Sequence, residues 1–414
     1  MPESSAQPNW PTAKAQTLGI GRLFTVFVVR VAALAFSTFP ISTSMLTPCR
    51  QLYHAPHRES PISPSSWRKW AGSIGGMDSL TQRMPFVTAF YRALGTGMVI
   101  SVDSPIGDES RSAMESLIED YERVLSRFRN NSLIATIGKT EHGGSFDFPD
   151  WCAPLFDLYD ALFSATSGAI DPCVGEDLIR LGYDASMSFT VTQDAPEHLG
   201  ALRGRATWGQ DVERHGTTLV TRGPVQLDFG ACGKGYLVDL LGRMLRSTQF
   251  VIDAGGDLLI HAEQPISIAL EDPEDSSRAI GVAHIVNGAL CASAPSRRHW
   301  NVAVNERAQI AIHHLLNAID GLPAQQTEAS WAYIPCNPQH FNKLHHTADK
   351  SANATPDIAR DYPAAVADGL ATALFVSDAT QLQRTFDFAY ATLNESRQIA
   401  ASRNFPADLF LRSA

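Results

Sequence analysis

The sequence predicts an α+β fold with largely antiparallel sheets and packed helices, extending from residue 84 to the end of the chain. Short apolar runs bounded by turn residues outnumber the segments with helical periodicity. These strands and helices also fail to alternate strictly along the chain. Because a doubly wound parallel sheet requires that alternation, the antiparallel arrangement is favoured.

The first predicted elements follow each other closely. Residues 97–102 are apolar and β-branched and predict a strand that ends before Pro105. Residues 109–128 carry apolar side chains at a period of 3.6 and predict an amphipathic helix. A second helix is expected over residues 151–164.

The second half of the chain predicts most of the sheet. Residues 250–253 form an apolar run that enters the turn Gly255-Gly256-Asp257. Further strands are expected at 266–270, 279–290 and 330–334, a polar loop at 345–358, and a helix over 365–376.

Residues 1–83 are interpreted as an N-terminal extension, and residues 84–414 as the folded domain. The extension is rich in Ser and Pro and contains one apolar run, residues 23–36, after Arg22. This run is interrupted by Arg30 and is shorter than the ~20 residues that a membrane span needs. A poor signal or anchor, which implies an exported or membrane-anchored protein, and a disordered or misassigned start, which implies a cytoplasmic one, both stay open.

Composition excludes some classes of function. The net charge is −10, which argues against a nucleic-acid partner. The first eighty residues differ in sign from the rest, because they carry seven Lys or Arg against three Asp or Glu. The six cysteines form no C-x-x-C pair, so reduced, mostly buried thiols are expected.

A glycine-rich loop at residues 228–235 is the strongest chemical signal. Gly230, Gly233 and Gly235 allow close backbone approach to a ligand, and Lys234 stands at the predicted start of a helix, where anions bind. The spacing differs from that of a P-loop, which excludes an ordinary ATPase. An acidic chain that handles phosphate also needs a bound cation.

Two further candidates lie downstream. In a helix, Asp368 and Thr372 share one face, and a carboxylate with a hydroxyl suits Mg²⁺. His314 ends an apolar stretch before a polar turn, and a neutral imidazole there can accept a proton from a hydroxyl. The alternatives are an ordinary helix with a back-bonded Thr372 and a hydrogen-bonded histidine at a strand end.

Together these segments resemble the FAD:protein FMN transferase (ApbE) family over residues 86–410. The motifs occur in the family's order: residues 93–96, 125–132, 167–172, 228–235, 255–257, 293–298, 314–321 and 368–372. The resemblance implies the family's α+β, T-fold-like architecture. It also implies a Mg²⁺-dependent enzyme that transfers the FMN phosphoryl group of FAD to a Thr or Ser hydroxyl of an acceptor protein and releases AMP.

The resemblance also implies roles for individual residues. The carbonyl of Ala231, with Asp368 and Thr372, would hold Mg²⁺. Lys234 would add a fixed positive charge, and His314 would act as base. The remaining cofactor-binding positions are Asp228, toward the adenosine, and Leu94, Ala169, Ile170 and Asp171, which would line the cofactor cleft.

Several positions depart from the family pattern. Leu94 replaces a methionine, Ala292 and Ala294 flank Ser293 in place of Thr and Gly, and Asn317 and Ala318 replace an acidic residue and a proline. Loss of the acid is expected to reduce the basicity of His314 or weaken metal binding. Two other functions therefore stay open: an FAD pyrophosphatase giving FMN and AMP, and a non-catalytic FAD-binding protein.

Overall fold

The computed structural model describes residues 77–337, except Arg92, Thr96, Glu306 and Arg307, together with residues 358–410 and two short strands near the N-terminus. Most of the expected extension, Thr96 of the first family motif, and residues 345–357 of the expected polar loop lie outside the described residues. No helix in the described part is long and apolar enough to cross a bilayer.

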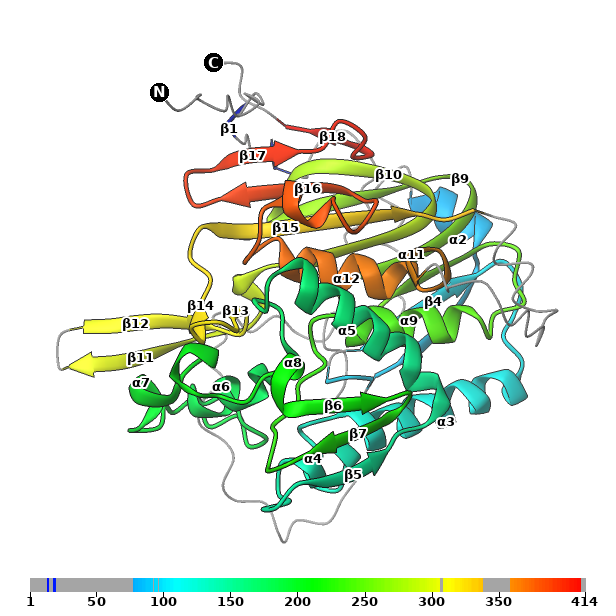
Figure 1. Cartoon of the computed structure of the whole chain (residues 1–414). Helices are drawn as coiled ribbons and strands as arrows, with labels where there is room; N and C mark the ends of the chain where they lie inside the picture. The colour runs from blue at the N-terminus through cyan, green and yellow to red at the C-terminus, as the bar shows by residue number, and fades with distance from the viewer. Residues whose placement is uncertain are drawn as a thin grey trace, which may run out of the picture.

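A large antiparallel sheet organises the molecule (Figure 1). Its strands follow the order β1-β17-β16-β15-β10-β9-β8-β4-β3, and β18 and β2 also pair with β10. The bounds are β1 Ala13–Lys14, β2 Leu18–Gly19, β3 Phe86–Phe90, β4 Met98–Val102, β8 Phe250–Asp253, β9 Asp257–Asp272, β10 Asp275–Ser293, β15 Thr327–Pro335, β16 Ala389–Asn394, β17 Gln398–Ala401 and β18 Ala407–Leu409. The predicted α+β class is confirmed, and the strands expected at 97–102 and 250–253 are β4 and β8.

The two faces of this sheet bury different apolar clusters because side chains alternate along a strand. In β8, Phe250 and Ile252 belong to the main core, whereas Val251 belongs to a second cluster on the opposite face. Leu80 of helix α2 (Met77–Arg83) packs in that second cluster, so the described fold already begins before residue 84.

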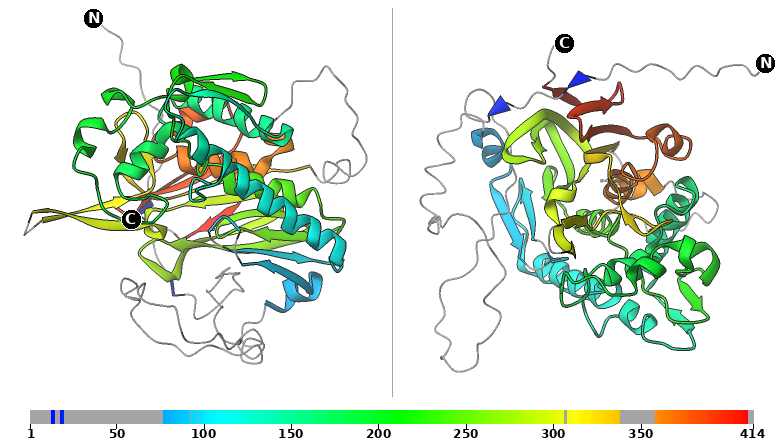
Figure 2. Two further views of the ribbon diagram at one scale, coloured as in Figure 1. Left: turned by 90° about the horizontal axis from the view of Figure 1, so that it is seen from below. Right: turned by 90° about the vertical axis from the view of Figure 1, so that its left-hand side faces the viewer.

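Four helices cover the main-core face (Figures 1 and 2). They are α3 Asp108–Leu125, α5 Ala153–Ala165, α9 Gly233–Gly242 and α12 Pro363–Ala373. Helices α9 and α12 cross so closely that a Cβ on Gly235 would lie 2.1 Å from the carbonyl oxygen of Ala364. Gly235 is therefore required by this crossing.

Two of the predicted helices end earlier than expected. The helix expected over 109–128 ends at Leu125, because Ser126 is extended (φ −86°, ψ 113°) and Arg127 turns toward Asp228. The helix expected over 365–376 begins at Pro363 and ends at Ala373.

Shorter elements build the rest of the molecule. A three-stranded sheet orders its strands β5-β7-β6, and a hairpin of β11 and β12 is followed by the small pair β13 and β14. Their bounds, with those of the remaining helices, are β5 Gly144–Asp147, β6 Val212–His215, β7 Thr218–Thr221, β11 His299–Asn305, β12 Ala308–His313, β13 Leu316–Asn317, β14 Leu322–Pro323, α4 Leu133–Ile137, α6 Gly175–Arg180, α7 Ala195–His198, α8 Trp208–Asp211, α11 Ile358–Asp361 and α13 Ala379–Leu382.

Candidate active site

Helices α9 and α12 bind each other's N-terminal N–H groups. Asp368 of α12 accepts a hydrogen bond from the N–H of Gly235 at 3.0 Å. In return, Asp239 of α9 accepts from the N–H groups of Ala364 at 3.1 Å and Ala365 at 2.8 Å. The first turn of a helix has no intrahelical partners for these donors, so each carboxylate stabilises the start of the other helix.

Lys234 lies between two buried carboxylates. Its Nζ is 3.1 Å from Asp257 Oδ2 and 3.2 Å from Asp368 Oδ1, and both aspartate side chains are only 1 % exposed. Burial lowers the pKa of Lys234, but the two carboxylates outweigh this and leave the pKa above its usual value. Lys234 therefore stays positively charged between these carboxylates.

The other two predicted metal ligands meet beside this group. Thr372 Oγ1 lies 3.3 Å from the carbonyl oxygen of Ala231, rather than bonding back to its own helix. Ser293 at the end of β10 adds a second hydroxyl, 3.4 Å from that of Thr372. Ala231, Asp368 and Thr372 are thus brought together from the glycine-rich loop and from α12.

Asp257 belongs to this group although it was not among the predicted site residues. Its Oδ2 contacts the ammonium of Lys234, whereas its Oδ1 has no hydrogen-bond donor among the described residues. The turn before it is held by Asp253, which accepts from the N–H groups of Gly255 at 2.8 Å and Gly256 at 3.2 Å. An acidic residue directly after two glycines at a strand end was the signal that identifies it.

The donor set fits a hard divalent cation. Two carboxylates, two hydroxyls and one carbonyl converge, and Mg²⁺ prefers such oxygen ligands. No cluster of three His, Cys, Asp or Glu side chains suited to a metal occurs in the described part of the chain. Burial raises the pKa of Asp368, and the neighbouring charge of Asp257 acts in the same direction. Bound cationic charge would offset this cost of ionisation.

His314 follows the last residue of β12 and is partly buried. Its Nδ1 lies 3.2 Å from the carbonyl oxygen of Arg298, so Nδ1 carries the proton in the neutral ring and Nε2 is a free acceptor. Burial lowers the pKa of His314 to about 3, and the positive charges of Arg298 and Lys234 contribute. The imidazole is therefore neutral at physiological pH, with Nε2 available to accept a proton, and it is less basic than an exposed histidine.

The two departures after His314 have local explanations. Asn317 Oδ1 accepts from the N–H of Ile319 at 3.0 Å, a turn contact that an amide makes as well as a carboxylate. Ala318 donates its N–H to the carbonyl oxygen of Ala169 at 3.0 Å, which a proline could not do. This bond joins the histidine loop to the turn that precedes Asp171.

Ala169, Ile170 and Asp171 are buried. The Asp171 carboxylate accepts from the N–H of Cys173 at 2.7 Å, and it lies 3.7 Å from the guanidinium of Arg205. Arg205 also donates to the carbonyl oxygen of Ala318 at 2.7 Å. Asp171 therefore fixes the turn itself, whereas contact with a cofactor stays a prediction.

Asp228 is held by Arg127 in an ion pair and accepts from the N–H of Gly230 at 2.6 Å. Its own N–H donates to the carbonyl oxygen of Pro172 at 2.7 Å, which joins the glycine-rich loop to the Asp171 turn. A carboxylate has about four acceptor positions, so Asp228 retains capacity for a ligand.

Leu94 lies apart from these contacts, in the connection between β3 and β4. It has a left-handed backbone (φ 53°), and its N–H donates to Glu122 at 2.8 Å. Helix α3 still reaches the site, because Tyr121 donates its hydroxyl to the carbonyl oxygen of Gly233 at 2.7 Å.

Cys232, inside the glycine-rich loop, is fully buried, and burial raises the pKa of its thiol well above the usual value. It is therefore no candidate nucleophile, because the reactive form is the thiolate. The five cysteines within the described residues are all free thiols.

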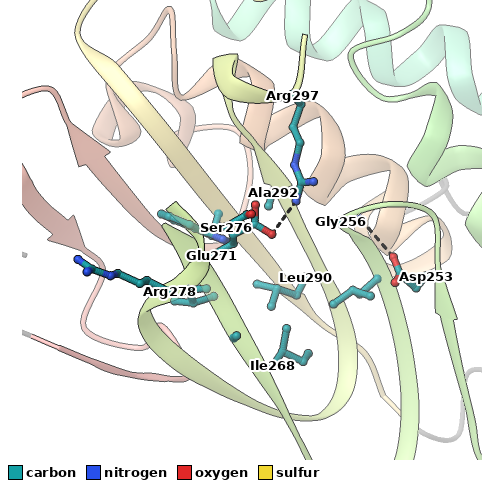
Figure 3. A pocket seen from close by; sticks show the side chains of 13 residues that line it. Asp253, Gly256, Ile268, Glu271, Ser276, Arg278, Leu290, Ala292 and Arg297 are labelled. Atoms are coloured by element: carbon teal, nitrogen blue, oxygen red, sulfur yellow. Dashed lines mark hydrogen bonds and ion pairs between the residues drawn. The ribbon is translucent and has the colours of Figure 1, made fainter. Parts of the chain in front are cut away.

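A cavity of about 80 Å³ adjoins the site (Figure 3). Gly256 and Ala292, the neighbours of Asp257 and Ser293, line it, together with Asp253 and the ion pair of Arg297 with Glu271. Among the described residues, none of the predicted catalytic or metal-binding residues lines this cavity.

Comparison with known proteins gives a consistent result. The ApbE family model matches residues 94–337. The ApbE protein from Thermotoga maritima is 22% identical, covers 79% of this chain and 99% of its own length, and superposes with a TM-score of 0.59. Flavin transferase ApbE from Vibrio cholerae is 16% identical over 77% of this chain and 97% of its own (TM-score 0.58).

A third structure, the apo form of the Pseudomonas stutzeri flavinyl transferase ApbE, is 20% identical over 79% of this chain and 98% of its own, with a TM-score of 0.58. No curated protein sequence matches the chain. The structures support the shared fold, and the family model spans more than half of the sequence, from Leu94 through the glycine-rich loop to the histidine loop. The chain belongs to the ApbE family.

Proposed function

We propose that this protein is a Mg²⁺-dependent FAD:protein FMN transferase. The observation that carries the proposal is the convergence of Lys234, Asp257 and Asp368 with the hydroxyl of Thr372, beside a neutral His314. Two proteins of similar structure, from Vibrio cholerae and Pseudomonas stutzeri, are flavin transferases, which supports the same reaction class.

Different residues would bind Mg²⁺, the phosphates, the adenosine and the flavin. Asp368, Thr372 and the carbonyl of Ala231 would hold Mg²⁺, with Asp257 as a further carboxylate at the same place. When bound, this ion would neutralise charge on the pyrophosphate of FAD. Lys234 supplies a fixed positive charge for the same phosphates. Asp228 would accept hydrogen bonds from the adenosine, and Leu94 with residues 169–171 would border the flavin-binding cleft.

His314 would activate the acceptor. Its Nε2 accepts the proton of a Thr or Ser hydroxyl, and that oxygen forms a bond to the FMN phosphorus. The bond between this phosphorus and the bridging oxygen of the pyrophosphate breaks, and AMP leaves with that oxygen. The acceptor thus gains FMN through a phosphoester, and no oxidant or reductant is consumed.

The test is intact-mass spectrometry of a flavin-acceptor domain, purified without its covalent FMN, after incubation with the full chain, FAD and Mg²⁺. We expect the mass of one FMN to be added, and we expect both Asp368→Ala and His314→Ala to abolish the addition. Free FMN and AMP without an adduct would instead identify a pyrophosphatase. Bound FAD that survives the incubation would identify a flavin-binding protein.

A further inference from the structure

The hairpin β11–β12 leads directly into the candidate base. β11 begins one residue after Arg298, whose carbonyl accepts from His314, and β12 ends at His313. In Figures 1 and 2 the hairpin extends away from the body of the molecule. Its root is fixed, because Trp300 and Ile312 are buried in a third apolar cluster. The base of the hairpin therefore lies next to the candidate catalytic base, His314.

Both long edges of the hairpin are open within the described part of the chain. β11 and β12 pair with each other from His299↔His313 outward, and neither pairs with a third strand among the described residues. Such edges present rows of N–H and C=O groups. An extended polypeptide binds to these rows by adding a strand, and side-chain contacts then give specificity.

Exposed apolar side chains lie beside the hairpin root. Met187 and Phe189 are 46% and 43% exposed, and the ring of Phe189 is 5.4 Å from that of Trp300. Both residues have a left-handed backbone, with φ of 53° and 50°. That conformation costs ~1–3 kcal/mol and tends to persist at functional sites. Exposed aromatic and Met side chains are typical of protein interfaces.

We propose that the acceptor protein docks as an added strand on the free edge of β12, the strand that ends next to His314. Met187 and Phe189 would contact apolar side chains of the acceptor. The inference rests on the proposed function. The acceptor is the occupant because the edge continues into His314: a strand paired along it advances ~3.3 Å per residue toward the base. A Thr or Ser a few residues beyond the paired segment then reaches Nε2.

The first test shortens the hairpin without moving His314. Asn301 and Ala311 face each other across the hairpin, so residues 302–310 can be replaced by Asn-Gly, which favours a two-residue turn. The buried pair Trp300–Ile312 is kept. We expect the FAD affinity, measured by flavin fluorescence, to be unchanged and the KM for the flavin-acceptor domain to rise at least ~10-fold. The variant M187S/F189S should act in the same direction.

The matched control is Tyr91→Ser, which removes an exposed aromatic residue beside β3. It should leave the KM for the acceptor unchanged. An unchanged KM for the acceptor in both the shortened-hairpin variant and M187S/F189S would overturn the docking proposal. Parallel losses of FAD affinity and of transfer would also overturn it.

Hydrogen–deuterium exchange tests the strand pairing itself. With the acceptor domain bound, exchange of amides in residues 299–313 should slow at least ~10-fold, because N–H groups at the free edge of the hairpin gain hydrogen-bond partners. Protection confined to another surface would refute the inference. Protection that increases with the concentration of this chain alone would instead assign the edge to a second copy. Absence of any transfer by the unaltered chain would refute the proposed function, which separates the two failures.

Discussion

Asp368 in α12 accepts a hydrogen bond from the N–H of Gly235 in α9 at 3.0 Å while its other oxygen lies 3.2 Å from the ammonium of Lys234. One buried carboxylate therefore both joins the two helices and forms part of the charged site. Any change at residue 368 has a structural and a chemical component. The two components can be separated by the choice of substitution.

Asp368→Asn should separate them. The amide oxygen can still accept from Gly235, so the protein should fold, whereas the loss of negative charge should reduce FMN transfer by ~100-fold or more. Asp368→Ala also removes the hydrogen-bond acceptor for the N–H of Gly235, and it should lower the free energy of unfolding by an additional ~1–3 kcal/mol. Thermal unfolding and transfer rates measure the two effects. Wild-type transfer by the Asn variant would refute the metal role.

Lys234→Met should make stability depend on divalent cations. The substitution leaves Asp257 and Asp368, each 1 % exposed, without their cation, at a cost of ~3–5 kcal/mol. Mg²⁺ would replace the missing charge, so it should raise the melting temperature of the variant more than that of the wild type. Lys139→Met, at an exposed lysine that donates to the carbonyl oxygen of Asn130, is the control and should show no such gain. Equal responses of both variants would contradict the ligand set.

Gly235→Ala should destabilise the fold strongly. The new Cβ would lie 2.1 Å from the backbone oxygen of Ala364, and the helices would have to move apart, at a cost of ~3 kcal/mol or more. Gly107→Ala, at the N-cap of α3 with no atom within 4 Å of the new Cβ, should cost only ~1 kcal/mol, because Ala is a poorer N-cap than Gly. Urea unfolding of both variants measures the difference. A Gly235→Ala protein with unchanged stability would show that the two helices adjust freely.

The sequence predicted the chemical composition of the site better than its contacts. Asp368 and Thr372 were placed on one helical face by their spacing, and both do contact the glycine-rich loop. Asp257 was missed as a site residue although it directly follows two glycines, because its contact with Lys234 depends on how β9 packs against α9. The end of α3 was misplaced because Phe128 continues the apolar periodicity, whereas its neighbour Arg127 forms an ion pair with Asp228, about a hundred residues away in the sequence.

The substitutions after His314 were interpreted from charge alone, and the structure adds their hydrogen bonds. The expectation for Asn317, a weaker base or a weaker metal site, stays a prediction, and its side chain also accepts a hydrogen bond from the N–H of Ile319 in the turn. A single sequence does not reveal which group a polar side chain hydrogen-bonds in the folded protein. Periodicity identifies elements, whereas partners depend on how the elements pack.

Restoring the family residues at positions 317 and 318 should affect stability to different extents. Asn317→Asp keeps the acceptor for Ile319 and should change stability by less than ~0.5 kcal/mol. Ala318→Pro removes the N–H that bonds Ala169 and should destabilise by ~1–3 kcal/mol. Thermal unfolding of the two single variants gives the comparison. A stabilised Ala318→Pro protein would show that the proline's rigidity outweighs the lost bond.

The pH dependence of His314 has a defined sign. Its pKa is lowered to about 3 in the folded protein, from an ordinary value near 6.5. The folded state therefore disfavours the proton, and the stability contributed by the neutral ring is complete above pH ~6.5 and is lost as the pH falls below it.

Relative to His314→Gln, the wild type should consequently lose up to ~2 kcal/mol between pH 7.5 and pH 5, which urea unfolding at both values can measure. The rate of transfer should behave differently, because the folded enzyme keeps Nε2 unprotonated. We expect no acid limb near pH 6.5 in kcat/KM for FAD. An acid limb at that pH that disappears in His314→Gln would show that His314 titrates as an exposed histidine and is not held neutral by its surroundings.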